Sequence, residues 1–360
     1  MEIAVIGSSL SGICAAHALA ARGLKVTILD VGEQLDAPRQ AIVQKLHDQA
    51  SIQWPTDESD LIRKNESYGK GVLPKKMHFG SSYIYAEDRP FAKLATMTEG
   101  RVPYPTFAKG GFSNIWGSAA LPVDGCDMAD WPVTRSEMDP YFQKVMQFMP
   151  LCGGEGNLSN AFPTYREALG SLDVGPQGEA LLADLDLAKV RLLQRQSIYG
   201  KARLAIHTQA ADGGVLPCNG CGHCFTGCVR NSIFSTLPIL DELVHSKKVE
   251  YRNGFFVESI DERDGKVYVR GTDTRLSKRS ELSFDSVFVG AGPINTTRLL
   301  LHSRKIYDQS VLLKESQKFV IPMLRLRGAE TAIDHPAITL ASVFFETKVP
   351  SLSDHWMHVQ

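Results

Sequence analysis

The sequence lacks a long hydrophobic run, since no stretch reaches the about 18 consecutive apolar residues that a membrane-spanning helix needs. It also lacks an excess of charge of either sign, because 39 basic and 40 acidic residues leave a net charge of -1. A chain with this balance has no field that attracts nucleic acid or an acidic membrane surface. The first apolar run, residues 3–6, has no basic segment before it, so we expect no signal peptide and a cytoplasmic protein.

Cysteine is scarce outside one short stretch. Four of the seven cysteines fall between Cys218 and Cys228. A chain without an export signal is expected in a reducing compartment, where structural disulfides are rare. The cluster therefore favours metal or redox chemistry over a disulfide framework.

The first thirty residues carry the clearest local pattern. The apolar run 3–6 predicts a strand, residues 13–21 predict a helix, and residues 26–29 predict a second strand that ends at Asp30. This order is typical of a βαβ unit. Further along, the periodicity predicts a helix from Thr134, with Glu137 at capping-box spacing and its apolar positions packed in a core. Other predicted elements are helices near 179–193, 238–245 and 296–302, a meander over 249–289 with turns at 264–265 and near 273, and strands within 319–360.

The turn between the first strand and helix, Gly7-Ser8-Ser9-Leu10-Ser11-Gly12, matches the G-x-G-x-x-G frame with Ser9 at the second glycine position. In this frame glycines permit a tight turn and close strand–helix packing, while the helix N-terminus offers N–H groups to phosphates. Asp30 ends the next strand, where a carboxylate accepts hydrogen bonds from a ribose. We therefore predict a dinucleotide site, the alternative being a plain tight turn. Cys14, inside the helix, is interpreted as a core residue.

Four separated segments resemble the glucose-methanol-choline (GMC) family of FAD-dependent oxidoreductases. They are the N-terminal turn with Asp30, the loop Lys109–Gly117, Trp131-Pro132 with Pro140-Tyr141-Phe142, and Gly292–Leu301. The resemblance implies an α/β protein: a Rossmann-like FAD-binding fold with a β-meander and a second, incomplete α+β substrate domain. The implied parts are an FAD-binding βαβ unit at 1–40, an irregular cover insertion at 41–105, a flavin-contacting loop at 106–130, a helical part of the substrate domain at 131–216, the cysteine loop, meander and return to the FAD domain at 217–305, and the start of a substrate-domain sheet at 306–360.

The resemblance also implies which residues contact FAD. The turn would hold the pyrophosphate, Asp30 the ribose, and Val257 the adenine through its backbone. The loop after Lys109 would follow the diphosphate and the isoalloxazine edge, with Trp116 facing the flavin, the alternative for Trp116 being a core aromatic. The complete set is Gly7, Ser8, Ser9, Ser11, Gly12, Asp30, Gly110, Gly111, Ser113, Asn114, Trp116, Val257 and Ala291.

No catalytic base is predicted. Family members are longer, and their catalytic histidine lies in a C-terminal region that has no counterpart here. His355 and His358 lie in what is expected to be a strand and match no catalytic motif. The resemblance therefore leaves three alternatives: a fragment, a chain completed by a second polypeptide, or a chain without activity.

Cys218, Cys221, Cys224 and Cys228 have the C-x2-C-x2-C-x3-C spacing of a bacterial ferredoxin run, with Val229 in place of the usual proline. Thiolates at this spacing on a glycine-rich loop can converge on one iron–sulfur cluster, although in two-cluster ferredoxins the fourth cysteine binds the other cluster. Structural zinc and free or disulfide-forming cysteines are the alternatives. His223, inside the loop, is interpreted as a solvated residue rather than a ligand.

The resemblance thus predicts a dehydrogenase that oxidises a CH–OH group of an alcohol or sugar, with electrons passed through a cluster to an acceptor protein or quinone. A non-catalytic electron-transfer subunit is the second hypothesis. The third hypothesis is an NAD-dependent Rossmann protein with a zinc loop. It ranks last because it leaves the loop at Gly110 and the segment at Gly292 unexplained.

Overall fold

The computed structural model describes residues 1–50, 53–63, 76–85, 105–166, 170–313, 319–328 and 338–360. The chain forms two compact units, each built from separate stretches. Unit 1 contains Met1–Ile42, Asp60–Ile115 and Ser235–Met323, and unit 2 contains Val43–Ser59, Trp116–Phe234 and Leu324–Gln360. No helix among the described residues is both long and apolar enough to cross a membrane.

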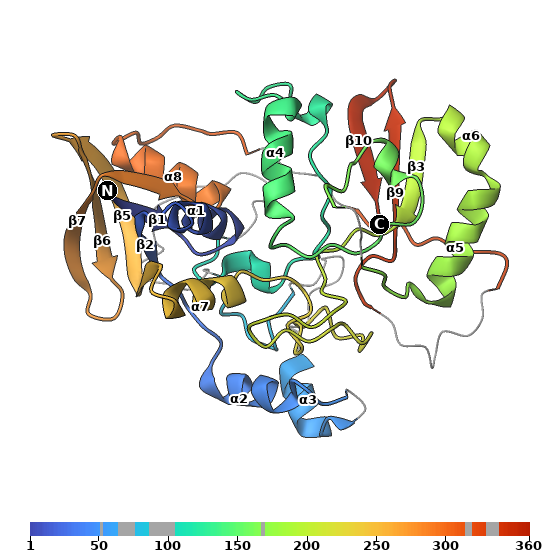
Figure 1. Cartoon of the computed structure of the whole chain (residues 1–360), viewed down its shortest axis with the longest axis horizontal. Helices are drawn as coiled ribbons and strands as arrows, with labels where there is room; N and C mark the ends of the chain where they lie inside the picture. The colour runs from blue at the N-terminus through green and yellow to red at the C-terminus, as the bar shows by residue number, and fades with distance from the viewer. Residues whose placement is uncertain (51–52, 64–75, 86–104, 167–169, 314–318, 329–337) are drawn as a thin grey trace. The chain divides into compact units, whose positions relative to one another are not determined.

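Unit 1 is organised around a four-stranded parallel sheet with the order β4-β2-β1-β8. Its strands are β1 (Glu2–Ile6), β2 (Lys25–Asp30), β4 (Val249–Asn253) and β8 (Ser286–Val289). Helices α1 (Leu10–Ala20) and α7 (Leu237–His245) pack on one face, where the side chains of Ile3, Val5 and Ile28 meet Ile13 and Leu240. Figure 1 shows strands β1 and β2 beside α1. The predicted βαβ unit is confirmed, and its strands are the two central ones of the sheet.

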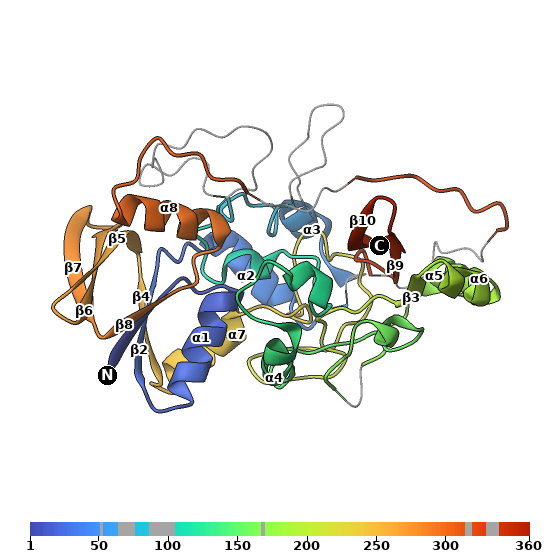
Figure 2. The same ribbon diagram turned by 90° about the horizontal axis from the view of Figure 1, so that it is seen from above.

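A three-stranded antiparallel meander covers the other face of this sheet. It comprises β5 (Phe255–Arg263), β6 (Lys266–Asp273) and β7 (Lys278–Phe284). Phe255, Val269 and Phe284 pack against Ala4 and Leu29 of the parallel strands. Helix α8 (Pro293–Ser303) follows β8 and packs along β5 (Figure 2).

The predicted meander is too long at both ends. Residues 249–253 and 286–289 belong to the parallel sheet as β4 and β8, because their backbones pair with β2 and β1. The predicted turn at Asp264-Gly265 is confirmed, and both residues have the left-handed φ values, 54° and 69°, that a tight hairpin turn requires.

Two helices interrupt the part of the chain that was predicted to be irregular. They are α2 (Ala37–Leu46) and α3 (Thr56–Arg63). Leu46 is the only side chain of α2 that is buried, so this helix lacks the apolar periodicity by which sequence analysis detects helices. Residues 64–75 and 86–104, which the same prediction includes, lie outside the described residues.

Unit 2 has a smaller antiparallel sheet with the order β10-β9-β3. Its strands are β3 (Ser197–Lys201), β9 (Val343–Val349) and β10 (Ser353–Val359). Its core combines Cys152, Leu158 and Leu204 with Ile198 of β3 and Phe344 of β9. The helices of this unit are α4 (Arg135–Val145), α5 (Gly175–Leu187) and α6 (Lys189–Gln194).

Helix α4 confirms its predicted start but not its predicted burial. Thr134 and Glu137 form the capping box, with the Thr134 N–H donating to the Glu137 carboxylate at 2.7 Å. None of the helix residues is buried, and Tyr141 is 57% exposed. Its apolar stripe instead lines a cavity of about 90 Å³ with Phe142 and Val145.

Candidate functional site

The turn after β1 requires glycine at two positions. Gly7 has a φ of 95° and donates its N–H to Leu29 O at 2.9 Å, which ties the turn to β2. A side chain on Gly12 would overlap the carbonyl oxygen of Gly7, so this position admits no Cβ without a backbone shift. The close approach of helix to turn that the sequence pattern predicts is therefore present.

The first turn of α1 is open to an anion. Ser9 precedes the helix in an extended conformation, and within the described residues its side chain does not cap the helix. The first helical turn also carries no acidic residue. The unpaired N–H groups and the positive end of the helix dipole both favour a phosphate at this point.

A hydrogen-bond network joins this turn to the loop at 109–114. Ser8 Oγ donates to the Asp30 carboxylate and accepts the Gly110 N–H at 2.8 Å. Thr236 Oγ1 donates to Ser8 O at 2.9 Å and lies 3.1 Å from Ser113 Oγ. Ser113 Oγ donates in turn to Gly110 O at 2.7 Å. All five residues are in unit 1, and a network satisfied in this way holds its members in one arrangement.

The same loop leaves room and a hydrogen-bond acceptor beside the turn. A Cβ on Gly111 would lie 2.7 Å from the Ser9 side chain, so bulk is excluded where the two segments meet. Asn114 donates its amide Nδ2 to Lys109 O at 2.8 Å. Its Oδ1 is buried and has no hydrogen-bond partner among the described residues. A buried acceptor of this kind is satisfied when a bound group donates to it.

Asp30 lies at the end of β2, as predicted, and is buried. Burial raises the pKa of its carboxyl to about 6, against the opposing effect of hydrogen bonds from Ser8, Tyr251 and the N–H groups of Gly32 and Val31. Tyr251 donates its hydroxyl to the carboxylate at 3.1 Å. The structure thus shows Asp30 anchoring the turn, and its contact with a ribose stays a prediction.

Sequence reasoning missed Thr236 and Tyr251. Thr236 is buried just before α7, and Tyr251 lies in β4 opposite Ile28 of β2. Neither belongs to a motif, and only the pairing of β4 with β2 places the tyrosine beside Asp30.

The remaining predicted contacts divide between the two units. Ser11 Oγ donates to Gly290 O at 3.5 Å, and the Ala291 Cα would lie 3.3 Å from a Cβ on Gly7. Val257 pairs with Gly271 inside the meander of unit 1. Trp116 begins a segment of unit 2, where its indole Nε1 donates to Phe234 O at 2.7 Å.

The cysteine loop of unit 2, residues 218–228, is closed at its base. Cys218 N–H donates to His207 O at 3.0 Å, and Ser232 Oγ donates to Leu216 O at 2.7 Å. Arg230 adds a bond from Nε to Pro217 O at 3.0 Å. The ends of the loop are therefore fixed by hydrogen bonds that do not involve the thiols.

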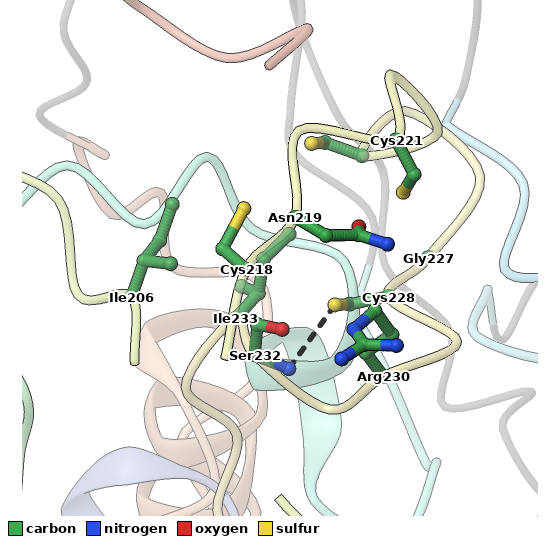
Figure 3. Close-up of a pocket in the computed structure, with 10 residues that line it drawn as sticks. Ile206, Cys218, Asn219, Cys221, Gly227, Cys228, Arg230, Ser232 and Ile233 are labelled. Carbon is green, nitrogen blue, oxygen red and sulfur yellow. Dashed lines mark hydrogen bonds between the residues drawn. The ribbon is translucent and has the colours of Figure 1, made fainter. Parts of the chain in front are cut away.

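The four thiols line one small cavity, of about 10 Å³ (Figure 3). Ser232 N–H donates to Cys228 Sγ at 3.1 Å, and the Gly220 N–H bonds to the Cys218 thiol. No three of the four sulfur atoms lie within 4.8 Å of one another. Burial raises the pKa of Cys218 to about 11 and also raises that of Cys228, so both are thiols at neutral pH in this structure.

His223 stacks on Trp54 with ring centroids 4.9 Å apart. The two histidines near the C-terminus lie in β10, in agreement with the predicted strand. His355 pairs with Asp127, and His358 Nδ1 lies 2.5 Å from the buried Glu346 carboxylate.

One comparison agrees with the predicted βαβ unit. A family model described as an NAD(P)-binding Rossmann-like domain matches residues 5–40. No curated protein matches the chain. Among solved structures, the crystal structure of halogenase PltM is similar at 12% identity and a TM-score of 0.25, over 82% of this chain. The chain spans 35% of the length of that halogenase.

Unit 1 therefore contains a Rossmann-like dinucleotide-binding domain, with the parallel order β4-β2-β1-β8 and separate antiparallel sheets elsewhere in the chain. The match covers the turn and β2 and does not distinguish FAD from NAD(P).

Proposed function

We propose that this chain is the FAD-binding part of an oxidoreductase that oxidises a CH–OH group of an alcohol or sugar. The observation that carries the proposal is the network joining Ser8, Asp30, Gly110, Ser113 and Thr236. It fastens a second, glycine-containing loop to the phosphate-binding turn. A pyrophosphate alone needs only the turn, whereas a flavin also needs a loop along its ring system.

The residues fit FAD on two further observations. The Asn114 Oδ1 is a buried acceptor with no partner among the described residues, and Gly111 keeps the space beside Ser9 free of side-chain bulk. When bound, FAD supplies a ring that accepts a hydride from the substrate carbon. The turn would hold its pyrophosphate, Asp30 its ribose, and the residues from Gly110 to Asn114 its ring edge.

The proposed FAD contacts also include Val257, at the adenine, and Ala291, beside Gly7. It assigns no catalytic base, and it leaves Trp116 as a flavin contact only by resemblance. The substrate is proposed as a small alcohol or sugar because of the resemblance to GMC oxidoreductases, with a protein or quinone as electron acceptor.

We further propose that the cysteine loop holds an iron–sulfur cluster that passes electrons onward from the flavin. The four cysteines fit such a cluster, because their thiols line one cavity and backbone N–H groups bond to three of them. A single tetrahedral zinc needs its sulfurs about 3.8 Å apart, as its Zn–S bonds of about 2.3 Å dictate. A cubane spreads its ligands over four irons, which agrees better with sulfurs that are not gathered within 4.8 Å.

The size of the cavity sets a condition on this assignment. A space of about 10 Å³ holds roughly one water-sized group, so a cluster requires the loop to widen around it. Three of the four cysteines are only partly buried, and Phe225 within the loop is 59% exposed. The segment between the fixed ends is therefore the part that would move.

An anaerobic ultraviolet–visible spectrum of the purified chain, taken before and after dithionite, tests both assignments. We expect flavin bands over a broad absorption that bleaches on reduction, with about four irons per chain. Cys228→Ser should remove most of the iron and the broad absorption and keep the flavin, while Cys14→Ser should change neither.

A chain that takes up no FAD would contradict the flavin proposal. Flavin bands without iron would contradict the cluster and leave zinc or structural cysteines.

A non-catalytic electron-transfer protein is the second candidate. It is favoured by the lack of an assignable base in the described part of the chain. Reduction of a dye by this chain with any of a panel of alcohols and sugars would exclude it.

A further inference from the structure

A second group of metal-ligating side chains lies in unit 2, away in sequence from the cysteine loop. It consists of Cys126, Asp127 and His355, which we name the 126/127/355 cluster. The Cys126 thiol, an Asp127 carboxylate oxygen and a His355 ring nitrogen all lie within 4.8 Å of one another. His355 Nδ1 also forms a hydrogen bond with Asp127 Oδ1. The three donors therefore already converge.

The fold places these side chains through one neighbouring residue. Cys126 and Asp127 belong to a short 3₁₀ turn, Gly125–Met128, which follows Asp124. One oxygen of Asp124 accepts the Cys126 N–H at 3.1 Å, and the other accepts the Trp356 indole N–H at 2.6 Å. Because Trp356 is next to His355 in β10, this carboxylate fixes the turn and the strand beside each other.

We propose that the 126/127/355 cluster binds one divalent cation of the zinc class. Thiolate, imidazole and carboxylate are the three donor types that zinc uses in proteins. Three protein ligands leave a fourth position for water, which is the arrangement of an open rather than a closed zinc site. Cys126 and Asp127 are partly buried and His355 is exposed, so an ion can enter from solvent.

The surroundings of Cys126 already hold a positive charge. Lys348 Nζ lies 3.7 Å from Cys126 Sγ and 4.9 Å from the centroid of the Trp356 ring. A bound cation would replace this ammonium group at the sulfur, and Asp124 and Asp127 supply negative charge near the same thiol. Lys348 has a flexible stem and can withdraw without a change in the fold.

The consequence is a metal-dependent link between the 124–128 turn and β10, the last strand of unit 2. The two segments now meet through hydrogen bonds between exposed or partly buried groups, which water competes for. A coordinated ion would join the same segments through bonds to both.

An anaerobic Co²⁺ titration of the reduced, metal-free full chain tests the proposal, because Co²⁺ substitutes for zinc and absorbs when bound to thiolate. We expect Cys126→Ser to remove one Co²⁺ equivalent with its thiolate absorption, and His355→Ala to weaken that equivalent at least tenfold. Cys14→Ser, which removes a thiol from α1, is the matched control and should leave the titration unchanged.

His355 is exposed, so its replacement by alanine leaves the fold intact, and a far-ultraviolet circular dichroism spectrum verifies this for each variant. If Cys126→Ser and His355→Ala both keep the wild-type stoichiometry and affinity, all the metal resides at the cysteine loop and the proposal is wrong. The same holds if the wild-type chain binds no Co²⁺ outside that loop. Neither result depends on whether the chain binds FAD.

Discussion

The Gly7–Gly12 turn and the cysteine loop are both glycine-containing segments, but hydrogen bonds hold them to different extents. In the turn, backbone and side-chain hydrogen bonds fix the positions of Gly7 and Ser8. In the cysteine loop, hydrogen bonds close the base, but no three of the four thiols lie within 4.8 Å of one another. A site made of backbone groups is complete once the chain folds, whereas the cysteine loop has to widen before a cluster fits among its thiols.

The largest expected effect is at the helix start. Gly12→Ala places a methyl group against the Gly7 carbonyl, which only a backbone shift relieves, so we expect a loss of about 3 kcal/mol or more of unfolding free energy and loss of bound flavin. Urea unfolding and the flavin-to-protein ratio measure the two effects. Gly117→Ala is the control, because nothing lies within 4 Å of its added methyl group. Equal stability of the two variants would show that the Gly7 carbonyl can move to make room for a side chain at position 12.

The pH dependence of stability is the next largest effect. The pKa of Asp30 is about 6 in the folded chain and about 3.9 in an unfolded one. The folded state therefore binds more protons between these values, and the stability contributed by this group falls by about 3 kcal/mol as the pH rises from 4 to above 6. Urea unfolding across this range should show the fall in the wild type and not in Asp30→Asn.

Asp273 provides a control of the opposite sign. It is only partly buried, and the N–H groups of Leu276 and Arg275 lower its pKa, so its contribution to stability grows as the pH rises. Asp273→Asn should keep the fall caused by Asp30. A fall that persists in Asp30→Asn would place its origin in another group.

A smaller effect is expected inside the network. Thr236→Val removes the hydroxyl that bonds Ser8 O and contacts Ser113, and leaves buried groups without a partner. We expect a loss of about 2 kcal/mol of unfolding free energy and weaker FAD binding. Thr297→Val is the matched control, since Thr297 makes one exposed bond to Pro293 O. Unchanged FAD affinity in Thr236→Val would separate the 109–114 loop from cofactor binding.

The smallest effect concerns the cysteine loop itself. His223 stacks on Trp54, so we expect His223→Ala to change the iron and zinc content by less than about twofold. Metal analysis of purified protein measures this against Cys221→Ser, which should lose most of the metal. A loss of metal in His223→Ala equal to that in Cys221→Ser would make the histidine a ligand.

The sequence was informative where a local rule determines the structure. The glycine frame from Gly7 to Gly12, the Thr134 capping box and the Asp264-Gly265 turn each depend on residues within a few positions, and each is present as predicted. Thr236, just before α7, and Tyr251, in β4, are brought to the site by elements more than 200 residues from the turn. Neither residue belongs to a sequence motif that would have predicted its position. The separation of the four thiols likewise could not be predicted from the spacing of the cysteines in the sequence, because that spacing limits only how far apart the thiols can lie.

The position of β1 has a consequence for how the chain is made. This strand pairs with β8, which follows it by about 280 residues, so Val5 has no partner on that edge until Phe288 has been synthesised. During translation β1 and β2 therefore exist as an open sheet with an apolar edge until β8 has been synthesised. Such long-range pairing slows folding and exposes nascent chains to aggregation, so β1 depends on protection until β8 has emerged.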